Sequence, residues 1–223
     1  MAEIWIAAGI WVGTHLGISS TPLRAVLVRV LGQGLYLLFF ALVAAAALAY
    51  LIWVYSQAPR FDYLWMPNPD LYWVAKVTMP LAMILLVGGF MLPKSNADEA
   101  QGWQVEPARG VLRITRHPMQ WAVIIWAIGH IVANGDTVSL VFFNAFLLLS
   151  FFGTFLMDHK QAQTDSDQWV QFSGVTSNLP FAALLAGRNR WAFREWMWPV
   201  VVGLGLYALA FYFHESFTGA IVG

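Results

Sequence analysis

Histidine is the residue in this sequence best suited to bind a metal or transfer a proton, and it occurs five times. Two of these residues, His15 and His130, lie inside apolar stretches, in the strings GTHLGISS and WAIGHIVANGD. An ionisable side chain inside a bilayer is costly, so each is a candidate functional residue. Opposed neutral imidazoles from two helices can hold the iron of a haem. The sequence therefore makes His15 and His130 candidate metal ligands. The alternative for His15 is a hydrogen bond across the bundle, and the alternative for His130 is a position near the membrane interface, capped by the Asn134-Gly135-Asp136 turn.

A second set of candidate residues precedes an apolar run, in the string RITRHP. Arg113, Arg116 and His117 gather charge immediately before Pro118, which suits the first turn of a helix. A helix N-terminus favours anions, so this position is a candidate anion or phosphate site. The alternative is an ordinary cationic anchor at the membrane edge. We expect the two other histidines, His159 and His214, to be solvated and interfacial, respectively.

The composition is that of an integral membrane protein. Of the 223 residues, 59% are hydrophobic and only 11% are charged, whereas soluble domains carry about 25% charged residues. The formal net charge is zero, which gives no reason to expect a nucleic-acid partner. The chain has no cysteine, which excludes disulfides, iron–sulfur clusters and a thiolate-ligated haem. We expect no cleavable signal peptide, because Glu3 stands where a basic region would be.

Hydropathy predicts an all-α integral membrane protein, a bundle of about six transmembrane helices forming a single domain over residues 1–223. A spanning helix needs about 20 mostly apolar residues. The expected spans are Ile4–Ile18, Leu35–Tyr55, Leu71–Leu92, Met119–Ala133, Val138–Met157 and Trp198–Phe217. We also expect Thr21 to cap a short helix over Leu23–Leu31, with Pro22 in its first turn.

The distribution of lysine and arginine predicts the orientation of these helices. Ten of the twelve basic residues fall in the connections after the first, third and fifth spans, and only Arg60 and Lys76 fall on the other side. By the positive-inside rule, the ten lie in the cytoplasm. We therefore expect a multi-pass protein of the cell inner membrane with both termini in the periplasm.

The expected spans also set the depth of each histidine. At about 1.5 Å per residue, His15 lies about 8 Å from the cytoplasmic edge and His130 about 20 Å from it, so their levels differ by about 12 Å. On level alone, His15 pairs with His117, and His130 pairs with His214.

Three strings of the sequence resemble the NnrU family of bacterial membrane proteins. They are THLGISSTPLR, GVLRITRHPMQWAVIIWAIGHIVANGDTVSL and SNLPFAALLAGR. The likeness covers nearly the whole chain, and the combination of R-I-T-R-H-P with W-x-x-x-H-x-x-x-N-G-D is highly specific. The family is similar to zeta-carotene isomerase, a haem b membrane enzyme of plants and cyanobacteria.

The resemblance implies haem b held by two histidines, and the matching positions are His15 and His130. Because this match is residue by residue, it favours that pair over pairing by level. Arg113 and Arg116 are then candidate partners of the haem propionates. The NnrU family is linked to nitrite and nitric oxide metabolism in denitrifiers, which implies a redox or accessory role beside a membrane oxidoreductase.

Other classes of function stay open. The first is isomerisation of a lipophilic polyene; the cysteine of zeta-carotene isomerase would fall at Ala127, so thiolate-for-imidazole exchange is excluded. The second is an S-adenosylmethionine-dependent membrane methyltransferase, which the Arg116–His117–Pro118 motif resembles, with Asp158 and Asp167 as the nearest acidic residues. The last is an assembly factor without any cofactor.

Overall fold

The protein folds as a set of helices. The computed structural model describes residues 1–92, 108–164 and 167–219, which form helices, short turns and one isolated bridge between Tyr63 and Asp136. The elements are α1 (Ala2–Gly13), η1 (Thr14–Ile18), α2 (Pro22–Gln57), α3 (Pro69–Phe90), η2 (Gly110–Arg113), α4 (Pro118–Asn134), α5 (Thr137–Thr164), α6 (Asp167–Val175), α7 (Ala182–Leu185) and α8 (Phe193–Thr218). Most of the polar connection expected to begin at Lys94 lies outside the described residues. Asp165, in the connection after the fifth expected span, also lies outside them.

Each of the six apolar segments is helical, but four of the helices are long and apolar enough to cross a membrane: α2, α3, α5 and α8. The α1 helix has 12 residues before its π-helical turn, and α4 has 17. At 1.5 Å per residue, α4 is about 25 Å long, somewhat less than the ~30 Å hydrocarbon core. The all-α class and a membrane-protein character with four candidate spans among the described residues are therefore confirmed, whereas the number six stays a prediction.

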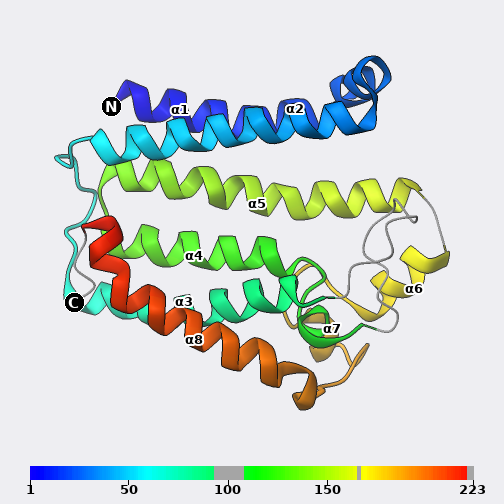
Figure 1. The fold of residues 1–223 in the computed structure, drawn as a ribbon. Coiled ribbons are helices and arrows are strands. Elements are labelled where there is room, and N and C mark those ends of the chain that lie inside the picture. Colours follow the sequence, from blue (N-terminus) through cyan, green and yellow to red (C-terminus); the bar gives the residue numbers. More distant parts are fainter. Residues whose placement is uncertain (93–107, 165–166, 220–223) are drawn as a thin grey trace.

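The long helices run across Figure 1 in alternating directions, so the N-terminus and the end of α8 lie at the same end of the bundle. The α1 helix packs on α2 and α5, α4 packs between α3 and α5, and α8 packs against α3. The short helices α6 and α7 lie at the opposite end, beside the start of α4 (Figure 1). The arginine-rich connections therefore gather at one end of the bundle, as the count of basic residues predicts.

Sequence signals account for the start of α2. The Thr21 hydroxyl accepts a hydrogen bond from the Leu23 backbone N–H, and Pro22 occupies the first turn. Gly32 then adopts φ +78°, a left-handed value that glycine tolerates, and interrupts the helix. This confirms the expected short helix over Leu23–Leu31.

An aromatic core joins three helices. Phe146 of α5 contacts Trp11 of α1 and Trp126 of α4, with ring centroids 5.3 Å and 5.5 Å away. The outer faces of α2 and α8 expose large apolar side chains such as Leu42 and Val201. Such broad apolar surface is unfavourable in water and is expected against lipid. The fold thus places its few inward histidines near an apolar, aromatic interior.

Candidate functional site

The first candidate ligand, His15, lies in the π-helical turn η1. Its Nδ1 is 2.9 Å from the carbonyl oxygen of Trp11, one turn earlier, and its ring contacts Trp11 and Phe40 at centroid distances of 4.1 Å and 5.6 Å. A Cβ atom added at Gly13 or Gly17 would meet nothing within 4 Å. The expected room for a close approach beside His15 is therefore present. Short π-helical turns are frequent at functional sites.

The second candidate ligand, His130, lies one turn before the end of α4 and repeats this arrangement. Its Nδ1 is 2.8 Å from the carbonyl oxygen of Trp126, and its ring lies 5.1 Å from the Trp126 ring. On the other side, its ring stacks on Phe143 of α5 at 4.7 Å. A Cβ atom at Gly129 would collide with Thr78 of α3. The space beside Gly129 is thus filled by a neighbouring helix.

In both W-x-x-x-H strings, the contact between Nδ1 of the histidine and the tryptophan carbonyl determines which ring nitrogen carries the hydrogen. A carbonyl oxygen can only accept a hydrogen bond, so the Nδ1 of each histidine must carry the hydrogen. The neutral ring then keeps its lone pair on Nε2. A histidine held through Nδ1–H to a backbone carbonyl is the usual form of a metal-ligating imidazole. His15 and His130 are both prepared chemically for ligation.

The structure does not bring these two rings together. Trp11 and Trp126 both contact Phe146, so they mark one level of the bundle. The α1 and α4 helices run in opposite directions in Figure 1, and each histidine lies one turn beyond its tryptophan. Four residues rise about 6 Å, so the Cα atoms of the two histidines lie about 12 Å apart along the bundle axis.

The histidine whose ring lies beside the His130 ring is His214 of α8. Their centroids are 6.3 Å apart and their planes differ by 29°. His214 also has Thr218 within hydrogen-bonding distance, at 3.2 Å from Nδ1. His159 instead lies exposed, with Nε2 2.9 Å from the Gln163 amide. The pairing of His130 with His214, expected from their levels alone, is therefore present in the fold.

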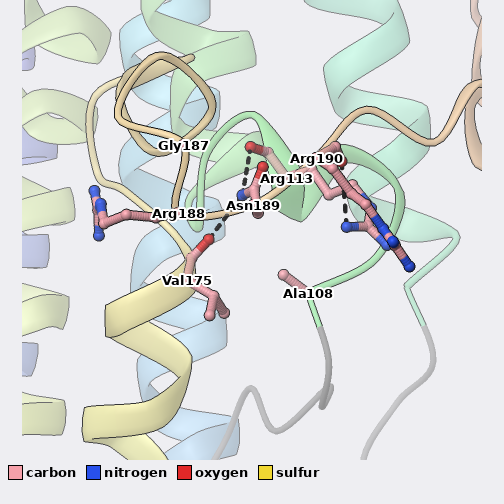
Figure 2. A pocket seen from close by; sticks show the side chains of 7 residues that line it. All are labelled: Ala108, Arg113, Val175, Gly187, Arg188, Asn189 and Arg190. Carbon is pink, nitrogen blue, oxygen red and sulfur yellow. Dashed lines mark hydrogen bonds between the residues drawn. The ribbon is translucent and has the colours of Figure 1, made fainter.

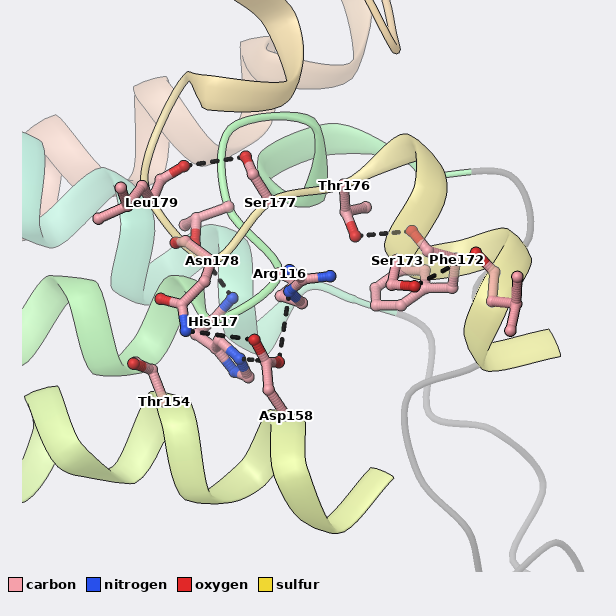
Figure 3. A network of polar contacts seen from close by, with 12 residues as sticks. Arg116, His117, Thr154, Asp158, Phe172, Ser173, Thr176, Ser177, Asn178 and Leu179 are labelled. Carbon is pink, nitrogen blue, oxygen red and sulfur yellow. Dashed lines mark hydrogen bonds and ion pairs between the residues drawn. The ribbon is translucent and has the colours of Figure 1, made fainter. Parts of the chain in front are cut away.

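The opposite end of α4 holds a polar network around Asp158 of α5 (Figure 3). Nε2 of His117 is 2.7 Å from Asp158 Oδ1, and Arg116 Nε lies 3.3 Å from the same oxygen. The Asn178 amide donates to Oδ2 at 3.2 Å. His117 is only 6% exposed. One carboxylate therefore joins residues from three distant parts of the chain.

Backbone pairing between two sequence motifs holds this network in place. The Arg116 N–H donates to the Ser177 carbonyl at 2.9 Å, and the Phe181 N–H donates to the Ile114 carbonyl at 2.8 Å. The Thr115 hydroxyl, fully buried, donates to the Asn178 carbonyl at 2.6 Å. The strings RITRHP and SNLPF, noted separately in the sequence, thus form one unit.

Arg116 is a poorly solvated cation within this unit. Burial lowers the pKa of its guanidinium, the charge of Asp158 partly offsets that effect, and Arg188 lowers the pKa further. The guanidinium also lies over the Trp169 ring at 5.3 Å. Its Nη1 is buried without a hydrogen-bond partner among the described residues. This arrangement favours an additional anionic or polar partner.

Asp158 was named in the sequence only as the acidic residue nearest to a methyltransferase-like motif, and the structure places it directly beside Arg116 and His117. Asp167, the other candidate, begins α6 and is exposed. Sequence reasoning did not find the contribution of Asn178; the string SNLPF, which stood out in the sequence, was the available signal. Binding of S-adenosylmethionine at this unit stays a prediction.

Arg113 is paired with a different carboxylate. Its Nε and Nη2 donate to the two oxygens of Glu195 at 2.9 Å and 3.0 Å, which ties η2 to α8. Arg113 also lines a cavity of about 390 Å³ (Figure 2). The remaining lining residues are Ala108, Val175, Gly187, Arg188, Asn189 and Arg190. The cavity is thus bordered by three arginines, of which Arg113 is already neutralised by Glu195.

The five residues expected to hold a cofactor are therefore divided between the two ends of the bundle. Thirteen residues separate His117 from His130, or about 20 Å along α4. Arg113 and Arg116 precede α4 and bind protein carboxylates, whereas His130 lies near its end. In the part of the chain that the structure describes, no three His, Asp or Glu side chains gather as a metal site.

Comparison with known proteins finds the same relatives that the three sequence strings indicate. The chain is 31% identical over 80 residues to the chloroplastic 15-cis-zeta-carotene isomerase of Arabidopsis thaliana, and 28% identical over 81 residues to that of Zea mays. Each match covers 36% of this chain and 22% of the relative. The matched region is thus about a fifth of the length of these curated relatives.

A family model gives the broader match. No solved structure matches the chain. The model described as NnrU protein matches residues 3–222, which includes both W-x-x-x-H histidines and both halves of the polar network. The chain therefore belongs to the NnrU family.

Proposed function

We propose that this membrane protein binds haem b, with His130 as one axial ligand, and serves as a redox or accessory factor in nitrite and nitric oxide metabolism. The observation that carries the proposal is the hydrogen bond from Nδ1 of His130 to the Trp126 carbonyl. That bond leaves the Nε2 lone pair for a metal, within an apolar bundle.

The donor set fits a haem better than a bare metal ion. A haem needs only one or two axial ligands from the protein, because the porphyrin supplies the other four. A bare ion needs three or more protein ligands, and the described residues form no such group. When bound, haem b would supply one-electron exchange at its iron.

Two histidines are candidates for a second residue that would hold the haem together with His130. The family resemblance implies His15, which shares the tautomer-fixing bond to a tryptophan carbonyl. His214 is the alternative given by proximity. The residues around His130 would orient its ring and exclude water: Phe143 stacks on it, and Trp126 packs between it and Phe146.

Absorption spectroscopy of the purified protein tests the proposal. We expect a Soret band in the oxidised protein and sharp α and β bands after dithionite reduction. His130→Ala should lose the haem or change the spectrum, and the exposed His159→Ala should retain it. A colourless wild-type protein that also fails to take up added hemin would contradict the proposal.

The physiological role is tested in a denitrifying host that lacks the gene. We expect slower consumption of nitrite or nitric oxide, restored by the wild-type protein and not by His130→Ala. We further propose that the protein lies in the inner membrane with both termini in the periplasm, beside a membrane oxidoreductase. The clustering of arginines at the end opposite the termini supports that orientation.

Isomerisation of a lipophilic polyene is the second candidate function. It is supported by the similarity to proteins named 15-cis-zeta-carotene isomerase. Ala127 stands where the resemblance places a cysteine, so a thiolate cannot replace an imidazole here. Expression in a host that accumulates 15-cis-zeta-carotene tests it: pigment analysis would show conversion if this candidate holds and unchanged pigment if it does not.

A further inference from the structure

We infer that the cavity beside the start of α8 binds the headgroup of an anionic phospholipid, with the Arg190 side chain as its main phosphate partner. The cavity lies at the end of the bundle opposite the N-terminus, and the inference holds whether or not the protein carries a haem. The ligand class is a lipid phosphodiester with a net negative charge, such as phosphatidylglycerol. A zwitterionic lipid such as phosphatidylcholine should bind there only weakly.

The cavity carries an excess of positive charge. Of the three arginines that border it, Arg113 is neutralised by Glu195, to whose two oxygens it donates at 2.9 Å and 3.0 Å. Arg188 and Arg190 form no ion pair in the part of the chain that the structure describes. Two cationic charges therefore remain at the cavity. A guanidinium binds the oxygens of a phosphate through parallel hydrogen bonds, so phosphate is the lipid group that this charge favours.

Arg190 is the less occupied of these two cations. Nη1 of Arg188 already donates to three carbonyl oxygens at the end of α6, those of Ser173, Gly174 and Thr176. Arg188 thus stabilises the end of that helix. The Arg190 side chain is exposed, whereas its carbonyl accepts a hydrogen bond from Arg113 at 3.3 Å. Figure 2 shows the Arg188 and Arg190 side chains extending to opposite sides of the connection that carries them. Arg190 can therefore turn to a ligand without loss of a contact within the protein.

The cavity is large enough for a headgroup, and its wall is held in place. Its volume is about 390 Å³, within the range of about 300–1,000 Å³ that is usual for small-ligand pockets. A Cβ atom added at Gly187, which lines the cavity, would meet nothing within 4 Å. The Gly187 and Arg188 N–H groups donate to the carbonyls of Leu184 and Ala183, at 3.1 Å and 2.9 Å. These bonds fix the connection that leads to Arg190 on α7.

The cavity also lies where lipid headgroups are expected. The α8 helix is long and apolar enough to cross a membrane and begins at Phe193, only three positions after Arg190. Trp191 stacks on Phe193 at a centroid distance of 6.1 Å, and Phe193 is 80% exposed. Exposed aromatic rings beside arginines are typical of the membrane interface, where basic pockets bind anionic headgroups. A lipid can thus place its phosphate at Arg190 and its acyl chains against Trp191 and Phe193.

Native mass spectrometry of the full-length protein in detergent tests the inference. The probes are phosphatidylglycerol and phosphatidylcholine with identical acyl chains, and we expect the wild type to bind phosphatidylglycerol more tightly. A basic residue near a membrane surface strengthens the binding of anionic lipid about fivefold, so Arg190→Gln should raise the dissociation constant by about that factor. Binding of phosphatidylcholine should not change. Arg29→Gln, which removes an exposed arginine at the same end of the bundle, is the matched control and should bind both lipids as the wild type does.

A conservative variant and a soluble competitor complete the test. Arg190→Lys keeps the charge, and lysine also binds phosphate, so it should bind phosphatidylglycerol more tightly than Arg190→Gln does. Equal losses in Arg190→Gln and Arg29→Gln would show that only the general surface charge attracts lipid, and equal binding of the two lipids would show no preference for an anion; either result overturns the inference. Displacement of phosphatidylglycerol by glycerol 3-phosphate would identify a soluble phosphate as the ligand instead of a lipid.

Discussion

His117 and Asp158 lie 41 positions apart in the chain and share a contact of 2.7 Å between Nε2 and a carboxylate oxygen. The carboxylate also faces Arg116 and Asn178, so it balances charge and polarity where α4 begins. This contact joins the end of α5 to the R-I-T-R-H-P motif. It also makes Asp158 the residue on which the polar network depends most.

Asp158→Asn should therefore destabilise the protein. The substitution removes the negative charge and leaves Arg116 buried beside a neutral amide. Hydrogen bonds to charged groups contribute about 1.5–3 kcal/mol each, so we expect the free energy of unfolding to fall by about 2 kcal/mol. Thermal unfolding in detergent measures the change, with Asp167→Asn as an exposed control. Equal effects of the two substitutions would contradict this role for Asp158.

The pair Arg60–Asp136 should make stability depend on acid pH. The two groups are 3.0 Å apart, and Asp136 also accepts from the Ser139 N–H at 2.8 Å. Burial raises the pKa of Asp136, but the hydrogen bonds from Ser139 and Arg60 and the charge of Arg60 outweigh it, so the pKa is lowered overall. Its stabilisation is thus fully present above the unfolded pKa of about 3.9, and falls as pH drops through the lower folded value.

Unfolding measured between pH 3 and pH 7 tests this dependence. We expect the wild type to lose stability at the acid end of the range. In Asp136→Asn the amide still caps α5 but does not titrate there, so that variant should be less stable at neutral pH and change less with acid. Parallel pH profiles for the two proteins would show that another carboxylate is responsible.

Gly203 should control how closely α8 approaches α3. A Cβ atom at this position would lie 2.8 Å from the Cα atom of Ile84, whereas one at Gly205 would meet nothing within 4 Å. Small residues allow close packing of membrane helices. Gly203→Leu should therefore lower the melting temperature by several degrees. Gly205→Leu is the matched control, and an effect of similar size there would count against this explanation.

Cysteine labelling should determine the orientation in the membrane, because the chain has no native cysteine. Met66→Cys and Ala186→Cys place single thiols at exposed positions in connections at opposite ends of the bundle. A membrane-impermeant maleimide should label Met66→Cys in cells with a permeabilised outer membrane, and Ala186→Cys only after lysis. The reverse pattern would place both termini in the cytoplasm.

The sequence by itself determined the class of protein, the positions of the helices and the gathering of arginines at one end. These properties follow from local composition: apolar length, capping residues such as Thr21, and the side of the chain on which each arginine falls. Depth along a helix is also local, because the rise per residue is constant. For that reason the level of His130 already matched that of His214 before any packing was known.

Only the tertiary structure decided which side chains meet. Asp158 reaches Arg116 and His117 because α5 ends beside the start of α4. Arg113 reaches Glu195 because η2 packs on α8. These contacts depend on the rotation and lateral order of helices, which hydropathy does not encode. The same reason explains why motif matching joined His15 to His130, whereas packing places His214 beside His130.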